Sequence, residues 1–160
     1  MKIIIAAFLI ILFANSFAQD NIDKIIIKKS ERQLYVVKNN TILKKYDIAL
    51  GKNPIGHKQK EGDKKTPEGY YFIDGKNAKS NFFLSLHTSY PSYFDKQVAL
   101  KKNYNPGKHI AIHGLPPAFL LSQYLFEGPD WTDGCIALNN SDMQELWNLT
   151  KEGTTIIIEP

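Results

Sequence analysis

The feature that most constrains this chain is a succession of short runs rich in β-branched and other apolar residues, with turn residues between them. Several runs alternate apolar and polar positions, which is the period of a half-buried β-strand. Asn39 and Asn40 separate two of the runs and predict a hairpin turn, because asparagine tolerates a positive φ. The expected strands are residues 24–29, 33–38, 41–50, 69–74, 82–87, 109–114, 135–138 and 154–159.

Two stretches in the C-terminal part depart from the strand pattern and predict short helices. Residues 116–128 place Pro117 at a helix start, where its missing N–H is harmless. Residues 140–153 place Ser141 at an N-cap with Gln144 three positions later. The apolar positions that follow share one face of this second helix: Met143, Leu146 and Trp147. We therefore expect a mainly β fold, a sandwich or barrel, with two short helices near its C-terminal end.

The first 18 residues have the layout of a cleaved signal peptide. A basic start precedes an apolar run from Ile3 to Phe13, and small residues at Ser16 and Ala18 suit a signal peptidase. An uncleaved membrane anchor is the alternative, but it needs roughly 20 apolar residues. We expect residues 24–160 to form one exported domain, with no stable membrane anchor after cleavage.

The composition says more about the single cysteine than about partners. The formal charge of +4 is a mild excess, and no cluster of arginines or stripe of basic and aromatic residues indicates nucleic-acid binding. In an exported protein, Cys135 has no partner for an internal disulfide, so its thiol is either well buried or useful. On the residues alone, a small buried hydrophobe and a nucleophile both remain open.

A candidate base for this thiol is His113. It ends the apolar run HIAIH just before Gly114, and a residue at the end of a strand often faces a cleft. Gly134 precedes Cys135 and permits a tight turn, so the backbone N–H groups there could stabilise an oxyanion. A neighbouring base that favours the thiolate is what makes a cysteine nucleophilic.

Zinc binding is an alternative use of the same residues. His109 and His113 would be roughly 13 Å apart on a strand, which is too far for both to bind one ion. A site made of Cys135, His113 and Asp133 with an outside ligand remains open. The glycine- and lysine-rich segment 51–69 is expected to be a loop and a candidate substrate-facing element.

The spacing of these residues resembles the L,D-transpeptidase catalytic-domain (YkuD-like) family. Its signature is His-Gly, a gap of about twenty residues, Ser or Thr, one further residue and Gly-Cys. This chain has His113-Gly114 and then Thr132-Asp133-Gly134-Cys135. The upstream segments ALGKNP, GDKKTPEGYYFI and LHTSYPS extend the resemblance over nearly all of the chain after the expected signal peptide.

The resemblance implies a cysteine acyltransferase that acts on peptidoglycan stem peptides through a thioester, without a metal or organic cofactor, in the periplasm or at the cell wall. We expect the chain to be a monomer. Cys135 would be the nucleophile and His113 the general base and later acid. The Gly114 carbonyl would orient the imidazole, and the Gly134 backbone would lie near the oxyanion. The implied substrate-binding residues are Thr132, Asp133 and Tyr90.

Two departures from the family pattern leave the reaction open. Many members have histidine where this chain has Asp133, and arginine where it has Ala137. A missing cation changes how a substrate carboxylate is held. Cross-linking, hydrolysis by a carboxypeptidase and release of a lipoprotein by an amidase therefore remain alternatives, as does a catalytically inactive wall-binding module.

Overall fold

The structure is a computed structural model that describes residues 21–117 and 130–160. The expected signal peptide lies outside the described residues, as does nearly all of the helix expected at 116–128. No helix within the described ranges is both long enough and apolar enough to span a membrane.

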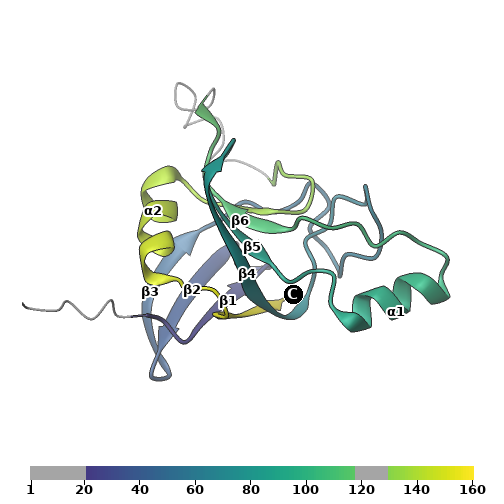
Figure 1. The fold of residues 1–160 in the computed structure, drawn as a ribbon, viewed down its shortest axis with the longest axis horizontal. Helices are drawn as coiled ribbons and strands as arrows, with labels where there is room; N and C mark the ends of the chain where they lie inside the picture. The colour runs from purple at the N-terminus through teal and green to yellow at the C-terminus, as the bar shows by residue number, and fades with distance from the viewer. Residues whose placement is uncertain (1–20, 118–129) are drawn as a thin grey trace, which may run out of the picture.

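The described chain is mainly β, as the sequence predicted, and its strands form one mixed sheet (Figure 1). The strand order is β3-β2-β1-β8-β4-β5-β6-β7. The β1/β8 and β6/β7 pairs are parallel, and the other pairs are antiparallel. The strands are β1 (Lys24–Lys28), β2 (Gln33–Lys38), β3 (Thr41–Asp47), β4 (Gly69–Ser80), β5 (Phe83–Thr88), β6 (Ala111–His113), β7 (Ile136–Ala137) and β8 (Thr155–Glu159).

The long strand β4 connects two halves of this sheet. Its first residues pair with β8, and from Ile73 onward it pairs with β5, with a register shift between Ile73 and Gly75. A β-bulge of this kind bends a strand and increases its twist. At the far ends, the chain beyond β3 reaches β7 through a bridge between Ala49 and Ala137. The two edges of the sheet are thus joined, which gives the fold its barrel-like form.

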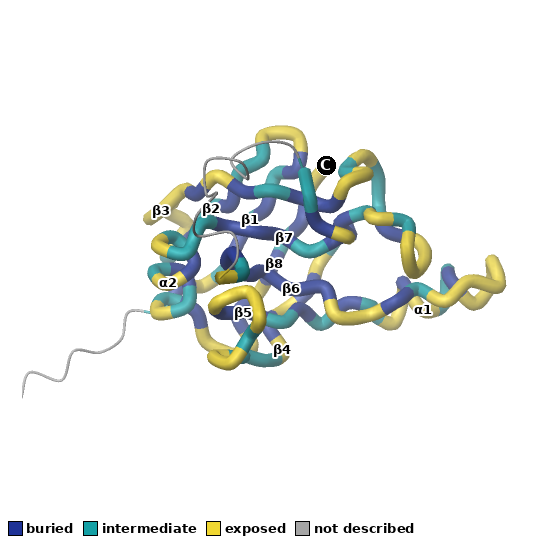
Figure 2. Tube along the Cα trace, turned by 90° about the horizontal axis from the view of Figure 1, so that it is seen from above, coloured by how far each residue is buried: buried dark blue, intermediate teal, exposed yellow. Residues whose placement is uncertain are grey.

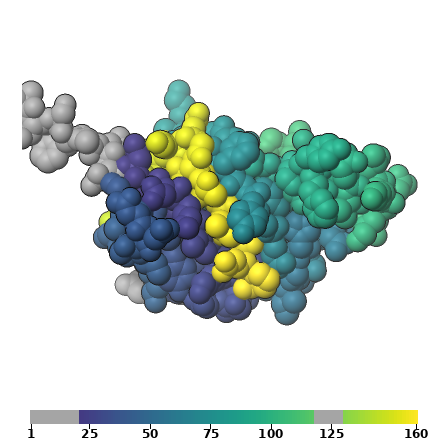
Figure 3. All heavy atoms as spheres, turned by 90° about the horizontal axis from the view of Figure 1, so that it is seen from below, coloured from purple at the N-terminus to yellow at the C-terminus, as the bar shows by residue number. Residues whose placement is uncertain are grey.

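The alternating runs bury one face as expected. In β1, Ile25 and Ile27 are fully buried, whereas Ile26 between them faces outward and is only partly covered. Figure 2 shows the buried positions gathered along the central strands. On the outer face, Figure 3 shows β8 in yellow between β1 in purple and β4 in teal. The hairpin turn is confirmed, since Asn39 and Asn40 have φ of 49° and 59°.

Helix α2 (Asn140–Leu149) lies where the second expected helix was placed, but its start was predicted wrongly. Asn139, not Ser141, is the N-cap, because the Asn139 side chain accepts a hydrogen bond from the Asp142 backbone N–H at 2.8 Å. Met143 and Leu146 are fully buried against the sheet, as expected.

Helix α1 (Tyr93–Lys101) was not expected from the sequence. It begins with a reciprocal capping box, in which Ser92 caps the Asp95 backbone and the Asp95 side chain caps that of Ser92. Tyr93 and Phe94 are exposed, so the helix lacks the wide apolar stripe by which amphipathic helices are recognised. In Figure 1 it projects at the side of the sheet opposite α2.

Candidate active site

The turn before β7 holds Cys135 through the side chain of Thr132. The buried Thr132 hydroxyl donates to the Cys135 carbonyl at 2.7 Å and accepts from the Gly134 N–H at 3.1 Å. The Gly134 N–H is therefore hydrogen-bonded within this turn. The Cys135 N–H has no acceptor among the described residues.

A long-range ion pair fixes the start of the same turn. The Arg32 guanidinium contacts both carboxylate oxygens of Asp130, with the Nη2–Oδ2 distance at 2.7 Å. Asp130 also accepts from the Leu50 backbone N–H at 2.9 Å. Because a bidentate pair of this kind restrains orientation as well as distance, it links the β1–β2 connection to the cysteine turn.

Two glycines let the loop 51–69 approach the cysteine turn closely. A Cβ on Gly51 would lie 2.2 Å from the Lys64 carbonyl oxygen, and one on Gly134 would lie 2.7 Å from that of Lys65. Gly134 also has a φ of +132°, which residues with a Cβ rarely adopt. No side chain larger than hydrogen fits at either position without displacing backbone.

His113 ends β6 with its imidazole buried. Its Nδ1 lies 2.7 Å from the Gly114 carbonyl oxygen, so Nδ1 carries the proton and Nε2 is left as a proton acceptor. The ring of Phe82 packs against the imidazole at a centroid distance of 4.5 Å, and that of Trp131 at 5.9 Å. The Gly114 turn is held by Asn140 at the start of α2, whose Oδ1 accepts from the Leu115 N–H at 2.7 Å.

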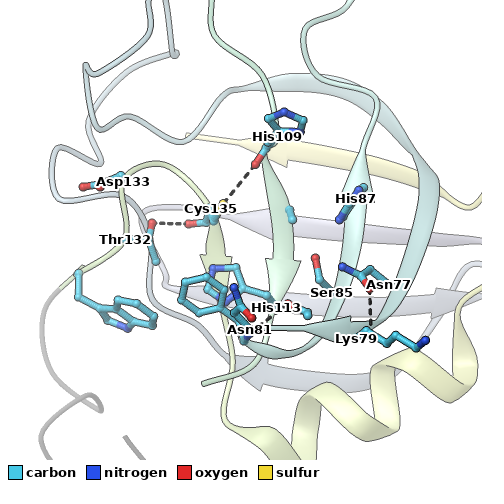
Figure 4. Close-up of a pocket in the computed structure, with 14 residues that line it drawn as sticks. Asn77, Lys79, Asn81, Ser85, His87, His109, His113, Thr132, Asp133 and Cys135 are labelled. Atoms are coloured by element: carbon cyan, nitrogen blue, oxygen red, sulfur yellow. Dashed lines mark hydrogen bonds between the residues drawn. The ribbon is translucent and has the colours of Figure 1, made fainter. Parts of the chain in front are cut away.

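Cys135 and His113 line the same cavity, which has a volume of about 510 Å³. Strands β4, β5 and β6 provide half of its lining residues, and Figure 4 shows Cys135 between Thr132 and His109. Trp131 and Phe82 supply its apolar surface. The other polar residues on its wall are Asn77, Lys79, Ser80, Asn81, Ser85, His87 and Asp133.

A second cavity of about 340 Å³ shares Cys135, His109 and Asp133 with the first. The segment 51–69, which the sequence marked as a candidate substrate-facing loop, supplies much of its wall. The lining residues from this loop and from the segment just before β6 are Lys58, Glu61, Gly62, Lys64, Gly107, Lys108 and Ile110.

Asp63 folds the part of the loop that lines this second cavity. It accepts from the backbone N–H groups of Gln59, Lys60 and Lys65, and from Lys58 Nζ at 2.8 Å. These hydrogen bonds lower the pKa of Asp63 although its burial opposes them. The buried Lys58 ammonium is thus fixed beside the cysteine turn rather than free in solvent.

Burial shifts the pKa values of the two central groups in opposite directions. It lowers the pKa of His113, against the opposing effect of the Gly114 carbonyl. It raises the pKa of the Cys135 thiol, and the Asp133 charge adds to this; the Ala111 backbone N–H and the Lys58 charge oppose it. At neutral pH the resting pair is therefore a neutral thiol and a neutral imidazole.

The structure does not bring every expected residue to this site. Tyr90 is buried, packs edge-on against Tyr71, donates to the Pro106 carbonyl at 2.8 Å and lines neither cavity. Asp133 lines both cavities, and its exposed carboxylate pairs with Lys52 Nζ at 3.3 Å.

His109 differs from expectation as well. It lies outside β6, with a left-handed φ of 63°, so the strand is shorter than the expected 109–114. Across residues 21–117 and 130–160, no three His, Cys, Asp or Glu side chains gather in a metal-binding group.

Several residues that build the site were not found from the sequence. Lys58 and Lys64 belong to a lysine-rich loop. The composition of this loop does not indicate that Lys58 is buried. The pairing of Arg32 with Asp130 joins residues 98 positions apart, and no local pattern marks it. Trp131 stands beside the recognised turn, and this adjacency is the one signal that could have included it.

This fold and this site define the class of protein. The chain belongs to the L,D-transpeptidase catalytic domain family, also called YkuD, whose model matches residues 22–158. Members of this family are enzymes that act on peptidoglycan.

Individual relatives agree with the family assignment. YafK of Escherichia coli strain K12 is 27% identical over 108 residues, which are 66% of this chain and 36% of that protein. Among solved structures, the helical cell shape determining protein Pgp2 of Campylobacter jejuni is 25% identical with a TM-score of 0.64, over 88% of this chain and 48% of that one. Bd1075 of Bdellovibrio bacteriovorus is 26% identical with a TM-score of 0.61, over 86% and 48%. The chain thus spans half or less of the length of these relatives.

Proposed function

We propose that this chain is an L,D-transpeptidase that cross-links peptidoglycan stem peptides through a thioester on Cys135. The observation that carries the proposal is the arrangement around His113. Its Nδ1 is anchored on the Gly114 carbonyl, its Nε2 is left as a proton acceptor, and its ring shares a cavity with the single thiol of the chain. This is the relation of nucleophile, base and orienting group on which acyl transfer depends.

In the first step, the Cys135 sulfur attacks the carbonyl carbon on the L-centre of a diamino acid, and His113 Nε2 takes the thiol proton. The negative charge moves to the carbonyl oxygen, within reach of the Cys135 backbone N–H. Collapse of this intermediate breaks the amide bond to D-alanine. His113 gives its proton to the departing amine, and a thioester remains on Cys135.

In the second step, an amine from a neighbouring stem peptide attacks the thioester carbonyl. His113 removes the proton from this amine, an amide bond forms, and the thiol is restored. Because Cys135 lines both cavities, an acyl donor in one and an amine acceptor in the other could both reach the sulfur. Access from two cavities supports transfer to a second peptide.

A hydrolase of the same family is the second candidate. Both cavities open to solvent, and Asp133 places an exposed carboxylate beside the thiol where many members have histidine. A carboxylate there favours an ammonium group near the scissile bond, whether that group belongs to an acceptor or to a leaving lysine. Water attack on the thioester would give a carboxypeptidase, and a leaving protein lysine would give an amidase that releases a lipoprotein.

The test is to incubate the purified protein with tetrapeptide-bearing muropeptides and to identify the products by mass. Loss of D-alanine together with dimers is the expected result, and loss without dimers would replace cross-linking by hydrolysis. Cys135→Ala is the control and should give neither product while remaining folded. Full turnover by that variant would refute the mechanism.

We further propose that the chain is exported and acts in the periplasm or at the cell wall. The apolar run Ile3–Phe13 and the small residues at Ser16 and Ala18 support this. N-terminal sequencing of the protein recovered from cells should give a mature start after Ala18. A chain that keeps Met1 would count against cleavage.

A further inference from the structure

His109 has a backbone conformation that is unusual for a residue leading into a β-strand. Its φ of 63° lies in the left-handed region, and its side chain is exposed, so packing of the imidazole does not explain the conformation. Such conformations cost free energy and gather at functional sites. His109 also stands at the meeting point of the two cavities.

The register of the parallel pair β6/β7 explains why the His109 carbonyl needs a partner. In this ladder the Leu138 N–H donates to the His113 carbonyl at 2.9 Å, and Ile112 pairs with Ile136. Each step along this ladder moves the donor and the acceptor back by two residues. Two steps back from Leu138 and His113, the same register would direct the Gly134 N–H to the His109 carbonyl. That N–H is instead taken by the Thr132 hydroxyl.

The Cys135 thiol occupies the place of the missing ladder donor. Its Sγ lies 3.6 Å from the His109 carbonyl oxygen, within the range of an S–H···O hydrogen bond. Figure 4 shows this contact as a dashed line, with the His109 ring on the side away from Cys135. It is therefore the backbone of His109 that reaches the sulfur.

We propose that His109 is a positioning residue whose left-handed backbone presents its carbonyl oxygen to Cys135 and holds the sulfur as a fixed, protonated thiol until substrate arrives. The inference rests on the proposed role of Cys135 as the nucleophile. Two residues further along the same strand edge, the Ala111 N–H favours the thiolate and so lowers the thiol pKa. The His109 carbonyl can thus accept a hydrogen bond from the protonated thiol, and the Ala111 N–H can donate one to the thiolate.

The first test separates the backbone of His109 from its imidazole. His109→Gly and His109→Asn both tolerate a left-handed φ and remove the ring, whereas His109→Val strongly disfavours that conformation because its side chain is β-branched. The measurement is the rate of Cys135 alkylation by iodoacetamide as a function of pH. Since the chain has one cysteine, the labelled product reports a single site.

The Gly and Asn variants should keep the wild-type pH profile. The Val variant should lower the apparent thiol pKa by about 0.5 unit, since the lost S–H···O bond stabilised the protonated form. Its alkylation near neutral pH should be about three times faster for the same reason. Asn40→Val is the matched control, because Asn40 has a similar φ of 59° but lies in the β2–β3 hairpin and lines neither cavity.

Two outcomes would overturn the proposal. If the Gly and Asn variants shift the profile as much as the Val variant does, the imidazole and not the carbonyl acts on the thiol. If the Val variant folds and keeps the wild-type profile, the left-handed backbone has no part in holding the sulfur.

The second test uses the wild-type protein and does not depend on how a variant folds. The infrared difference spectrum between wild type and Cys135→Ala isolates one S–H stretching band. A hydrogen-bonded thiol should absorb at lower frequency than a free thiol in an apolar solvent, and a band at the free position would overturn the proposal. Neither test requires turnover, so loss of muropeptide activity with an intact band would refute the proposed function and not the thiol contact.

Discussion

Replacement of Thr132 by valine removes the hydroxyl that holds the cysteine turn and changes little else in size. Valine matches threonine in shape, so no cavity is opened, but the Gly134 N–H and the Cys135 carbonyl both lose their partner. Thr132→Ser is the matched control, because serine keeps the hydroxyl and loses only a methyl group.

The contacts set the size of the effect. A buried donor without a partner costs about 1–3 kcal/mol, and the loss of a hydrogen bond to a partly exposed carbonyl costs about 0.5–1.5 kcal/mol. The free energy of unfolding should therefore fall by about 2–4 kcal/mol in Thr132→Val. In Thr132→Ser it should fall by about 1 kcal/mol, the value of one buried methyl group.

Urea unfolding followed by tryptophan fluorescence measures both changes, since Trp131 is next to the substituted residue. Turnover should also fall in Thr132→Val, by about 10- to 100-fold, because a reacting atom displaced by a fraction of an ångström loses alignment. Equal stability and equal turnover in the Val and Ser variants would refute the reasoning that this hydroxyl holds the Cys135 turn.

Three further outcomes follow from the same site. His113→Gln should abolish acylation by substrate while leaving the fold intact, and substrate-dependent thioester formation seen by mass spectrometry in that variant would exclude His113 as the base. As pH falls below the ordinary histidine value of about 6.5, the unfolded chain takes up a proton before the buried His113 does, so the wild type should lose stability there while His113→Gln loses less. A urea series at several pH values checks this sign. Gly134→Ala should be more destabilising than the control Gly153→Ala. Both glycines have a positive φ, but only at Gly134 would the added Cβ meet backbone, at 2.7 Å from the Lys65 carbonyl oxygen. Equal unfolding midpoints for the two variants would contradict this close approach.

Much of the fold was predictable because it follows from the local alternation of apolar and polar residues. The alternation in KIIIK places Ile25 and Ile27 on one face whatever they pack against, and consecutive asparagines at 39 and 40 suit the positive φ of a tight hairpin. Helix α1 was not predicted, because its sequence lacks such local periodicity. Its exposed Tyr93 and Phe94 break the apolar periodicity, and its Ser92–Asp95 capping box is too short a signal by itself.

For the site, the sequence by itself determined the candidate reacting groups: one thiol, a histidine followed by glycine, and a polar turn with the spacing of a known family. Only the tertiary structure decided their surroundings. The commitment of the Gly134 N–H to Thr132, the burial of Lys58, and the contact of the His109 carbonyl with the thiol depend on strand register and loop packing. Lys58 and His109 are distant from Cys135 in the sequence, and a pattern with a period of two or 3.6 residues carries no information about such long-range contacts.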